Sequence, residues 1–216
     1  MKIKKILPKK IYLSLTKIYS KIVPFFIVKL LPNKIAPAKI RYRFILELAK
    51  KNNIKAFVET GTYLGDTTNA LKNYFKEIYS IEISSDLVKL AQKRFQKYPH
   101  IHIIQGDSGE QLKNILPKID QKTIFWLDGH YSENFLHSND KQKNNNETPI
   151  QKEISIIFES NIKNFDNIIL IDDAHEFDGT RGYPTIEEVR HQVQGYNKEY
   201  NVYLKYNIIF VIKNTS

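Results

Sequence analysis

Acidic side chains follow a series of short apolar stretches in this 216-residue chain, at the points where β-strands are expected to end. In a parallel sheet the carboxyl ends of the strands share one edge, and ligands bind beyond that edge. We therefore expect these carboxylates to gather along one rim and to bind a polar ligand, a cation or both. In chain order they are Glu59, Glu82, Asp107, Asp128 and the pair Asp172 and Asp173.

The first apolar stretch, residues 55–59, runs into a loop with two glycines. Glycine lets the backbone turn sharply and approach a ligand closely, and a helix that follows such a loop offers free N–H groups. The spacing is E-x-G-x-x-x-G, so the G-x-G-x-x-G fingerprint of dinucleotide-binding proteins is not met. The pattern predicts a cofactor-binding loop, with contacts from Glu59, Gly61, Tyr63, Gly65 and Thr67.

The next two acids suit the nucleoside part of a cofactor. Glu82 lies 23 residues after Glu59, the distance at which an acid after the second strand accepts hydrogen bonds from ribose hydroxyls. Asp107, followed by Ser108, is suited to accept a hydrogen bond from an adenine amino group, and we assign both residues to the cofactor site. The alternatives are a surface acid for Glu82 and a simple turn residue for Asp107.

Asp128, Asp172 and Asp173 follow strands that we expect to be neighbours, so their carboxylates could converge. Three carboxylates within a few ångströms repel one another unless a cation lies among them. Oxygen ligands favour Mg²⁺, with Mn²⁺ or Ca²⁺ as alternatives. The sequence therefore predicts a divalent metal held by these three residues, unless Asp172 or Asp173 only caps a loop.

A histidine follows each of these two acidic segments. His130 lies two residues beyond Asp128, where a neutral imidazole could accept the proton of a substrate hydroxyl. We expect Asp128 and His130 to carry the catalytic step, with His175 as the rival base. Either histidine could instead be a supporting or surface residue.

From about residue 41 the chain alternates between helix and strand. This alternation predicts an α/β, Rossmann-like fold: a mostly parallel, seven-stranded sheet with helices on both faces and an antiparallel last strand. Asp66 is expected to cap the second helix. The expected helices span residues 41–51, 66–76, 84–95, 110–116, a stretch from 149, and 185–194; the expected strands span 55–59, 77–82, 100–105, 123–127, 167–171 and two within 200–213.

The net charge of +10 comes from the N-terminus: residues 1–51 carry +13 and the remainder carries −3. A nucleic-acid enzyme more often spreads positive charge around its active-site face, so we do not expect a nucleic-acid partner. We divide the chain into a basic amphipathic segment, residues 1–40, and one catalytic domain, residues 41–216. The longest uncharged apolar run of the segment, Ile22–Val28, is far shorter than the ~20 residues that span a bilayer. The segment either lies on an anionic membrane surface or caps the domain as an ordinary helix.

The chain has no cysteine, which excludes disulfides, thiolate metal sites and a cysteine nucleophile. This suits a reducing compartment, and we expect a cytoplasmic protein that could lie peripherally on the inner face of the membrane. A cleavable signal peptide is not expected, because lysines interrupt the apolar part of the N-terminus. The polar stretch 131–148 is the candidate lid over the site.

The glycine loop resembles the first motif of the Rossmann-like, S-adenosylmethionine (SAM)-dependent methyltransferases. Over residues 55–190 the chain also resembles the metal-dependent sugar O-methyltransferases of the macrocin O-methyltransferase type. The resemblance lies in Asp128-Gly129-His130-Tyr131, Thr148-Pro149-Ile150…Glu153 and Ile171-Asp172-Asp173-Ala174. It implies SAM as the cofactor and methylation of a sugar or glycan-related hydroxyl near a bound Mg²⁺ or Mn²⁺.

Three alternatives remain open. A catechol-type O-methyltransferase would differ only in its acceptor, and a degenerate membrane-associated protein would bind SAM without turnover. A nucleic-acid methyltransferase is disfavoured, because the Asn/Asp-Pro-Pro-Tyr/Phe motif that grips a flipped base amine is absent after the fourth strand. The lack of cysteine also excludes C5-pyrimidine chemistry through a thiolate. The oligomeric state is left open.

Overall fold

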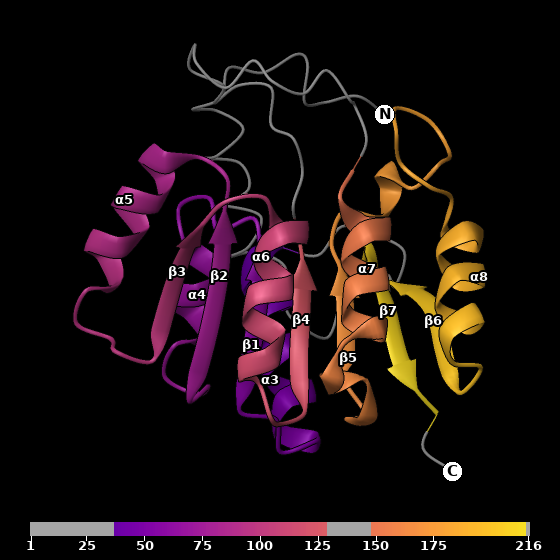
Figure 1. The fold of residues 1–216 in the computed structure, drawn as a ribbon, viewed down its shortest axis with the longest axis horizontal. Coiled ribbons are helices and arrows are strands. Elements are labelled where there is room, and N and C mark those ends of the chain that lie inside the picture. Colours follow the sequence, from indigo (N-terminus) through magenta and orange to yellow (C-terminus); the bar gives the residue numbers. More distant parts are fainter. Residues whose placement is uncertain (1–36, 129–147, 215–216) are drawn as a thin grey trace.

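The structure is a computed structural model that describes residues 37–128 and 148–214. These residues form one seven-stranded sheet in the order β3-β2-β1-β4-β5-β7-β6 (Figure 1). The strands are β1 (Ala56–Thr60), β2 (Glu77–Glu82), β3 (Ile101–Gln105), β4 (Thr123–Leu127), β5 (Ile168–Ile171), β6 (Tyr200–Lys205) and β7 (Ile208–Lys213).

The strand directions confirm the predicted fold. The β3-β2-β1-β4-β5 part is parallel throughout, and β7 runs antiparallel to both β5 and β6. Strands β1, β4 and β5 are buried along their whole length, which explains why their sequences are almost continuously apolar. β1 lies between β2 and β4, so the chain changes direction across the sheet there, and this switch point is where such folds bind ligands.

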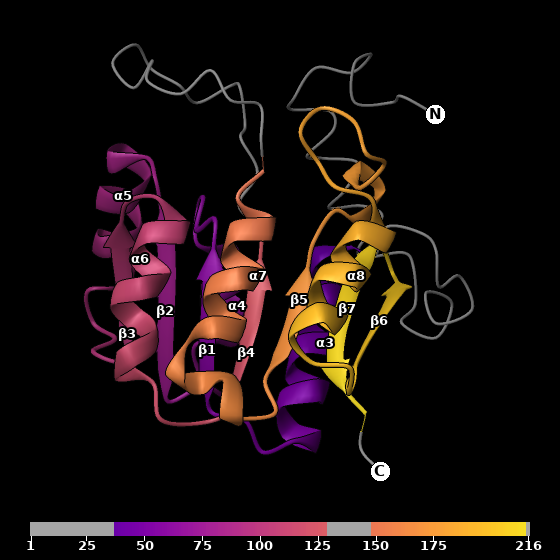
Figure 2. The same ribbon diagram turned by 45° about the vertical axis from the view of Figure 1, so that its right-hand side comes forward.

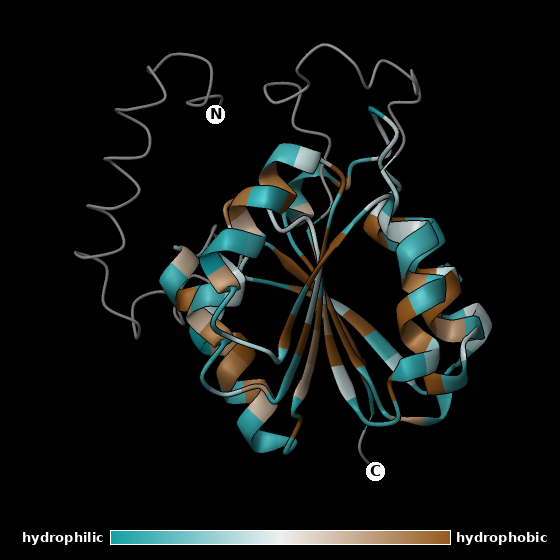
Figure 3. Ribbon diagram, turned by 60° about the vertical axis from the view of Figure 1, so that its left-hand side comes forward, coloured by the Kyte–Doolittle hydropathy of each residue, from teal (hydrophilic) through white to brown (hydrophobic). Residues whose placement is uncertain are grey.

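Helices cover both faces of the sheet, as Figure 3 shows from the edge of the sheet. α6, α7 and α8 enclose one core with the inner residues of the strands, and α3, α4 and α5 enclose the other. Figure 2 shows α6, α7 and α8 side by side on one face. The helices are α3 (Ala38–Lys51), α4 (Asp66–Leu71), α5 (Ser85–Phe95), α6 (Ser108–Ile115), α7 (Ile150–Glu159) and α8 (Ile186–Tyr196), with short 3-10 turns at Leu116–Lys118, Asn161–Asn164 and Ala174–Glu176.

Some helix boundaries differ from the sequence prediction. α4 ends at Leu71 and begins after Gly65, whose left-handed backbone (φ 75°) forms the cap; Asp66 makes no capping bond and pairs with Arg94 instead. α6 begins two residues earlier than expected, because Asp107 accepts a hydrogen bond from the Glu110 backbone N–H and caps the helix. The structure confirms the predicted bounds of two strands, 77–82 and 123–127.

α3 begins at Ala38, three residues before the helix that we expected over residues 41–51. The predicted basic segment, apart from its last residues, lies outside the described residues. No helix within 37–128 and 148–214 is long and apolar enough to cross a bilayer.

Candidate active site

The glycine loop between β1 and α4 is held against the end of β2. The backbone N–H groups of Gly61 and Thr62 both donate to the carbonyl oxygen of Ile81, at 2.9 and 3.2 Å. Gly65 needs to be glycine for two reasons: its φ is 75°, and an added Cβ would lie 2.7 Å from the Phe95 ring. The loop is therefore a tight, fixed turn at the switch point of the sheet.

Glu82 fastens this loop to the next helix. Its Oε2 accepts the backbone N–H of Tyr63 at 2.8 Å, and its Oε1 accepts the backbone N–H of Ser84 at 2.9 Å. The carboxyl group is largely buried, with a residue exposure of 7%. Each carboxylate oxygen has a second lone pair, so Glu82 can brace the loop and still accept hydrogen bonds from a ribose.

Large apolar side chains are exposed next to Glu82. Tyr63 and Leu64 in the glycine loop are 42% and 45% exposed, and Ile83, which follows β2, is 53% exposed. Water contact with apolar side chains of this size is unfavourable, and such patches mark binding surfaces. Leu64 and Ile83 were not among the predicted site residues, although their positions beside Gly65 and Glu82 were a usable signal.

Glu59 lies behind the glycine loop, inside the protein. Its residue exposure is 1%, and its Oε2 accepts hydrogen bonds from Thr68 Oγ1 at 2.8 Å and Ser80 Oγ at 2.5 Å. Burial raises the pKa of Glu59 to about 7, against the effect of these hydroxyl groups, and the nearby charge of Asp128 raises the pKa further. The structure thus places Glu59 where it ties α4 and β2 to β1.

Three further predicted cofactor contacts, Asp107, Ser108 and Thr67, lie at the starts of two helices, α6 and α4. Asp107 caps α6 and is 3.5 Å from the ammonium of Lys152 on α7, and Ser108 is the first residue of α6. Thr67, in the first turn of α4, hydrogen-bonds the Tyr42 side chain on α3. The turn interpretation of Asp107 is therefore correct as local structure, and its contact with an adenine stays a prediction.

Asp128 stands at the centre of the carboxyl edge, directly after β4. Its backbone N–H donates to the carbonyl oxygen of Thr60 at 3.1 Å, and its side chain is half-buried. Its charge contributes to raising the pKa of Glu59 on one side and of Tyr183 on the other. Asp128 is therefore the carboxylate that links the cofactor loop with the segment after β5.

Asp172, one of the predicted metal ligands, forms an ion pair with an arginine of the same chain. The residue is 2% exposed, and its Oδ2 pairs with the guanidinium Nη1 of Arg41 on α3. Asp173 has a left-handed backbone (φ 50°), and its Oδ1 is 3.4 Å from the Asn207 amide nitrogen and 3.9 Å from His175 Nδ1. Across 37–128 and 148–214, no group of three or more His, Cys, Asp or Glu side chains is placed to hold a metal ion. The donor set that we predicted does not fit a metal site in the described structure, because Arg41 neutralises one of its members.

The hydrogen bonds with Asn207 select one tautomer of a neutral His175. The Asn207 Oδ1 accepts the backbone N–H of His175 at 2.9 Å, so the amide nitrogen faces the imidazole and donates to Nδ1 at 3.0 Å. In a neutral ring the proton then sits on Nε2, which is 3.1 Å from Glu176 Oε1. In this arrangement His175 donates a hydrogen bond and has no open lone pair for a substrate proton.

The segment after β5 forms the other wall of the edge, and sequence reasoning identified only its first part, Asp172, Asp173 and His175, and not residues 176–183. Glu176 pairs with Arg181 at 2.7 Å, and Tyr183 lies near both. Burial raises the pKa of Tyr183 to about 12, with further contributions from the charges of Glu176, Asp173 and Asp128. Tyr183 therefore stays protonated and can donate a hydrogen bond at neutral pH.

His130 and nearly all of the predicted lid, 131–148, lie outside the described residues.

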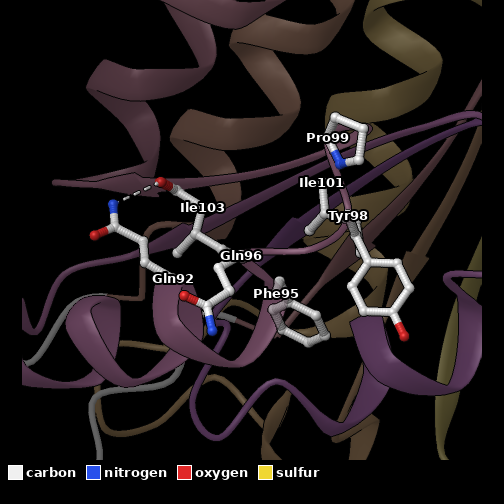
Figure 4. A pocket seen from close by; sticks show the side chains of 7 residues that line it. All are labelled: Gln92, Phe95, Gln96, Tyr98, Pro99, Ile101 and Ile103. Atoms are coloured by element: carbon white, nitrogen blue, oxygen red, sulfur yellow. Dashed lines mark hydrogen bonds between the residues drawn. The ribbon is translucent and has the colours of Figure 1, made fainter.

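A separate hollow of about 300 Å³ lies between the end of α5 and the start of β3 (Figure 4). It is lined by uncharged residues: Gln92, Phe95, Gln96, Tyr98, Pro99, Ile101 and Ile103. Because this hollow is at the amino end of β3, it is distinct from the carboxyl edge where the acids gather.

Residues 38–145, which make up half of the chain, match the family model described as ribosomal RNA adenine dimethylase. No curated protein matches the sequence. Among solved structures, an O-methyltransferase from Bacillus cereus in complex with SAH is 14% identical, with a TM-score of 0.57 over 97% of this chain and 93% of that one. An SAH-bound methyltransferase from Podospora anserina is 14% identical, with a TM-score of 0.56 over 97% and 99% of the two chains. The O-methyltransferase TomG from Streptomyces achromogenes, in complex with SAM, is 10% identical, with a TM-score of 0.53 over 85% and 82%. At these identities the likeness shows a shared fold.

Proposed function

The chain belongs to the ribosomal RNA adenine dimethylase family and is a SAM-dependent methyltransferase, and from this premise we propose that it methylates a hydroxyl group of a sugar or glycan-related small molecule. The acceptor does not follow from the family name, because the matched residues 38–145 cover the cofactor half of the fold and Asp128, but not the rest of the carboxyl edge. The match ends before α7, and α7, α8 and the segment after β5 form the half that would meet an acceptor.

The observation that carries the cofactor assignment is the arrangement around Glu82. A buried carboxylate with spare lone pairs, next to the exposed side chains of Leu64 and Ile83, is suited to a group with a polar diol and a flat apolar ring. The residues present therefore fit the nucleoside of SAM, with Asp107 and Ser108 on its far side. When bound, SAM supplies an activated methyl group.

The chain's own residues would bind the acceptor and remove its proton. Asp128, at the centre of the edge, is the described carboxylate best placed to orient a hydroxyl, and Tyr183 can donate a hydrogen bond to it. His175 is occupied by Asn207 and Glu176, which leaves His130 as the proposed base. A base would also need to be protected from bulk water, which is the role we propose for the 131–148 segment.

A hydroxyl acceptor is supported by three separate observations. Two of the structures with a similar fold are described as O-methyltransferases. The Asp128-Gly129-His130-Tyr131 segment lacks the pair of prolines of the base-amine motif. The segment after β5 is rich in charged and hydroxyl side chains, which suit a polar acceptor such as a carbohydrate.

The family match itself favours a second candidate, an exocyclic adenine amine in RNA. The net charge of −3 over residues 52–216 speaks against extended contact of this part of the chain with a phosphate backbone. The two candidates place different atoms at the same methyl group, so a product assay separates them.

The test is transfer from SAM that carries a deuterated methyl group. The purified chain is incubated with nucleotide sugars and oligosaccharides, with catechol, and with unmodified RNA, and the products are analysed by mass spectrometry. We expect the label on a sugar hydroxyl with the wild type, and none with Asp128→Asn. Label only on adenine would establish the second candidate. Label only on catechol would support O-methylation but refute a sugar as the acceptor. SAM binding without any methyl transfer would indicate a degenerate enzyme.

A further inference from the structure

Arg41 and Tyr42, near the start of α3, connect the two halves of the carboxyl edge. Tyr42 hydrogen-bonds Thr67, two residues beyond Gly65 of the glycine loop. Arg41 pairs with Asp172 at the end of β5, 131 residues further along the chain. One helical turn thus contacts the cofactor side and the acceptor side of the site.

The Arg41–Asp172 pair is withdrawn from water. The Asp172 side chain is 3% exposed and the Arg41 side chain 23% exposed. The guanidinium carbon lies 6.0 Å from the centre of the Trp126 ring, which closes another side of the pair. Within the described part of the chain, Asp172 Oδ1 and Arg41 Nε are buried without a hydrogen-bond partner.

A buried carboxylate is strongly unfavourable unless a positive group compensates its charge. A divalent cation is one solution, and we predicted it for Asp172 from the sequence. The guanidinium of Arg41 is another solution that is always charged and requires no exchangeable ion. Both cannot occupy Oδ2 of Asp172, because the metal and the guanidinium would repel each other.

We propose that Arg41 is a positioning residue that takes the place of the predicted metal ion beside Asp172, so that the chain binds no divalent cation at this carboxylate and methyl transfer does not require one. The part of this inference that concerns turnover rests on the proposed function. The part that concerns metal binding does not, since it follows from the ion pair alone.

The experiment is isothermal titration of the full, EDTA-treated chain with MgCl₂ and with MnCl₂, together with thermal melting with and without each ion. The wild type should show no saturable binding and no change in melting temperature. Arg41→Gln should gain saturable binding of at least one ion, because Asp172 loses its charge partner. This binding should vanish in the double variant Arg41→Gln/Asp172→Asn, and Arg41→Lys should behave as the wild type.

Arg43→Gln is the matched control, because Arg43 lies on the same helix but its side chain is 60% exposed and pairs with Glu47. It should bind no ion. Saturable Mg²⁺ or Mn²⁺ binding by the wild type that Asp172→Asn removes would overturn the proposal, and so would a folded Arg41→Gln that binds neither ion. If Arg41→Gln does not fold, the wild type and Asp172→Asn still decide between the two outcomes.

The rate of methyl transfer with and without EDTA is a second, independent measurement. Methyl transfer by the wild type should be unchanged by EDTA, and its loss on chelation with recovery on addition of Mg²⁺ would also overturn the proposal. An absence of any methyl transfer would count against the proposed function, while the calorimetric and melting results would stand by themselves.

Discussion

The buried carboxyl group of Glu59 predicts a specific dependence of stability on pH. The pKa of Glu59 is raised from 4.5 to about 7 in the folded chain, chiefly by burial. The folded protein therefore holds this proton over a pH range in which the unfolded chain has lost it. The stability that Glu59 contributes is accordingly fully present below the unfolded pKa of 4.5 and is lost as the pH rises through the folded pKa of about 7.

The size of the effect follows from the two pKa values. A shift from 4.5 to about 7 corresponds to about 3 kcal/mol in the free energy of unfolding when fully expressed, and about 2.5 kcal/mol of this falls between pH 5 and pH 8. Glu59→Gln removes the titration and keeps an oxygen for Thr68 and Ser80. The variant should therefore gain about 2.5 kcal/mol relative to the wild type over this interval.

Urea unfolding at pH 5, 6, 7 and 8 measures this difference. The single tryptophan, Trp126, is fully buried, so its fluorescence reports unfolding. Glu110→Gln is a control of opposite sign: the pKa of Glu110 is lowered, first by its hydrogen bond from Lys152, so its carboxylate stabilises the fold at neutral pH and this contribution is lost as the pH falls. Parallel pH profiles for the wild type and Glu59→Gln would refute the reasoning.

Three further predictions concern the residues that shape the site. Asp128→Asn should lower the pKa of Glu59, because it removes a nearby negative charge, and the pH profile of unfolding should then shift to lower pH; an unshifted profile would mean that the two carboxyl groups do not interact. Gly65→Ala should cost about 1–2 kcal/mol and weaken SAM binding, because its Cβ would contact Phe95 from a left-handed backbone; a variant as stable as the wild type would contradict the geometry. Asn207→Ala and Asn207→Gly should both lose the bonds to His175, but Asn207→Gly should be more stable by about 1 kcal/mol, because residue 207 has a φ of 62°. Chemical denaturation distinguishes the last pair, and equal stability would count against backbone strain.

The fold could be predicted from the sequence because its signals are local. The apolar run Thr123–Leu127 has the composition of a strand that is buried on both faces, and the structure gives β4 the same bounds. The start of α4 at Asp66 was predicted correctly, but its cap was misassigned because Asp66 is a common capping residue, whereas the cap is a glycine with a left-handed backbone. Two competing local signals lay one residue apart there, and only the backbone angles decide between them.

The site was predicted as a set of strand ends, and the structure places those ends on one edge. The sequence could not predict which side chains lie against each carboxylate. Asp172 pairs with Arg41 across 131 residues, and Glu59 is enclosed by hydroxyl groups of α4 and β2. Such partners depend on how the helices pack over the sheet, and a pattern of acids along the chain carries no information about that packing.

The central claim, that the edge around Glu82 binds SAM, is tested most directly by isothermal titration of the full chain with SAM. The account predicts one saturable site per chain, and about tenfold weaker binding in Glu82→Gln, since an amide cannot accept the backbone N–H groups of both Tyr63 and Ser84. Glu199→Gln, at a surface ion pair with Lys213, should bind as the wild type does. No saturable binding by the wild type, or equal affinity in Glu82→Gln, would contradict it.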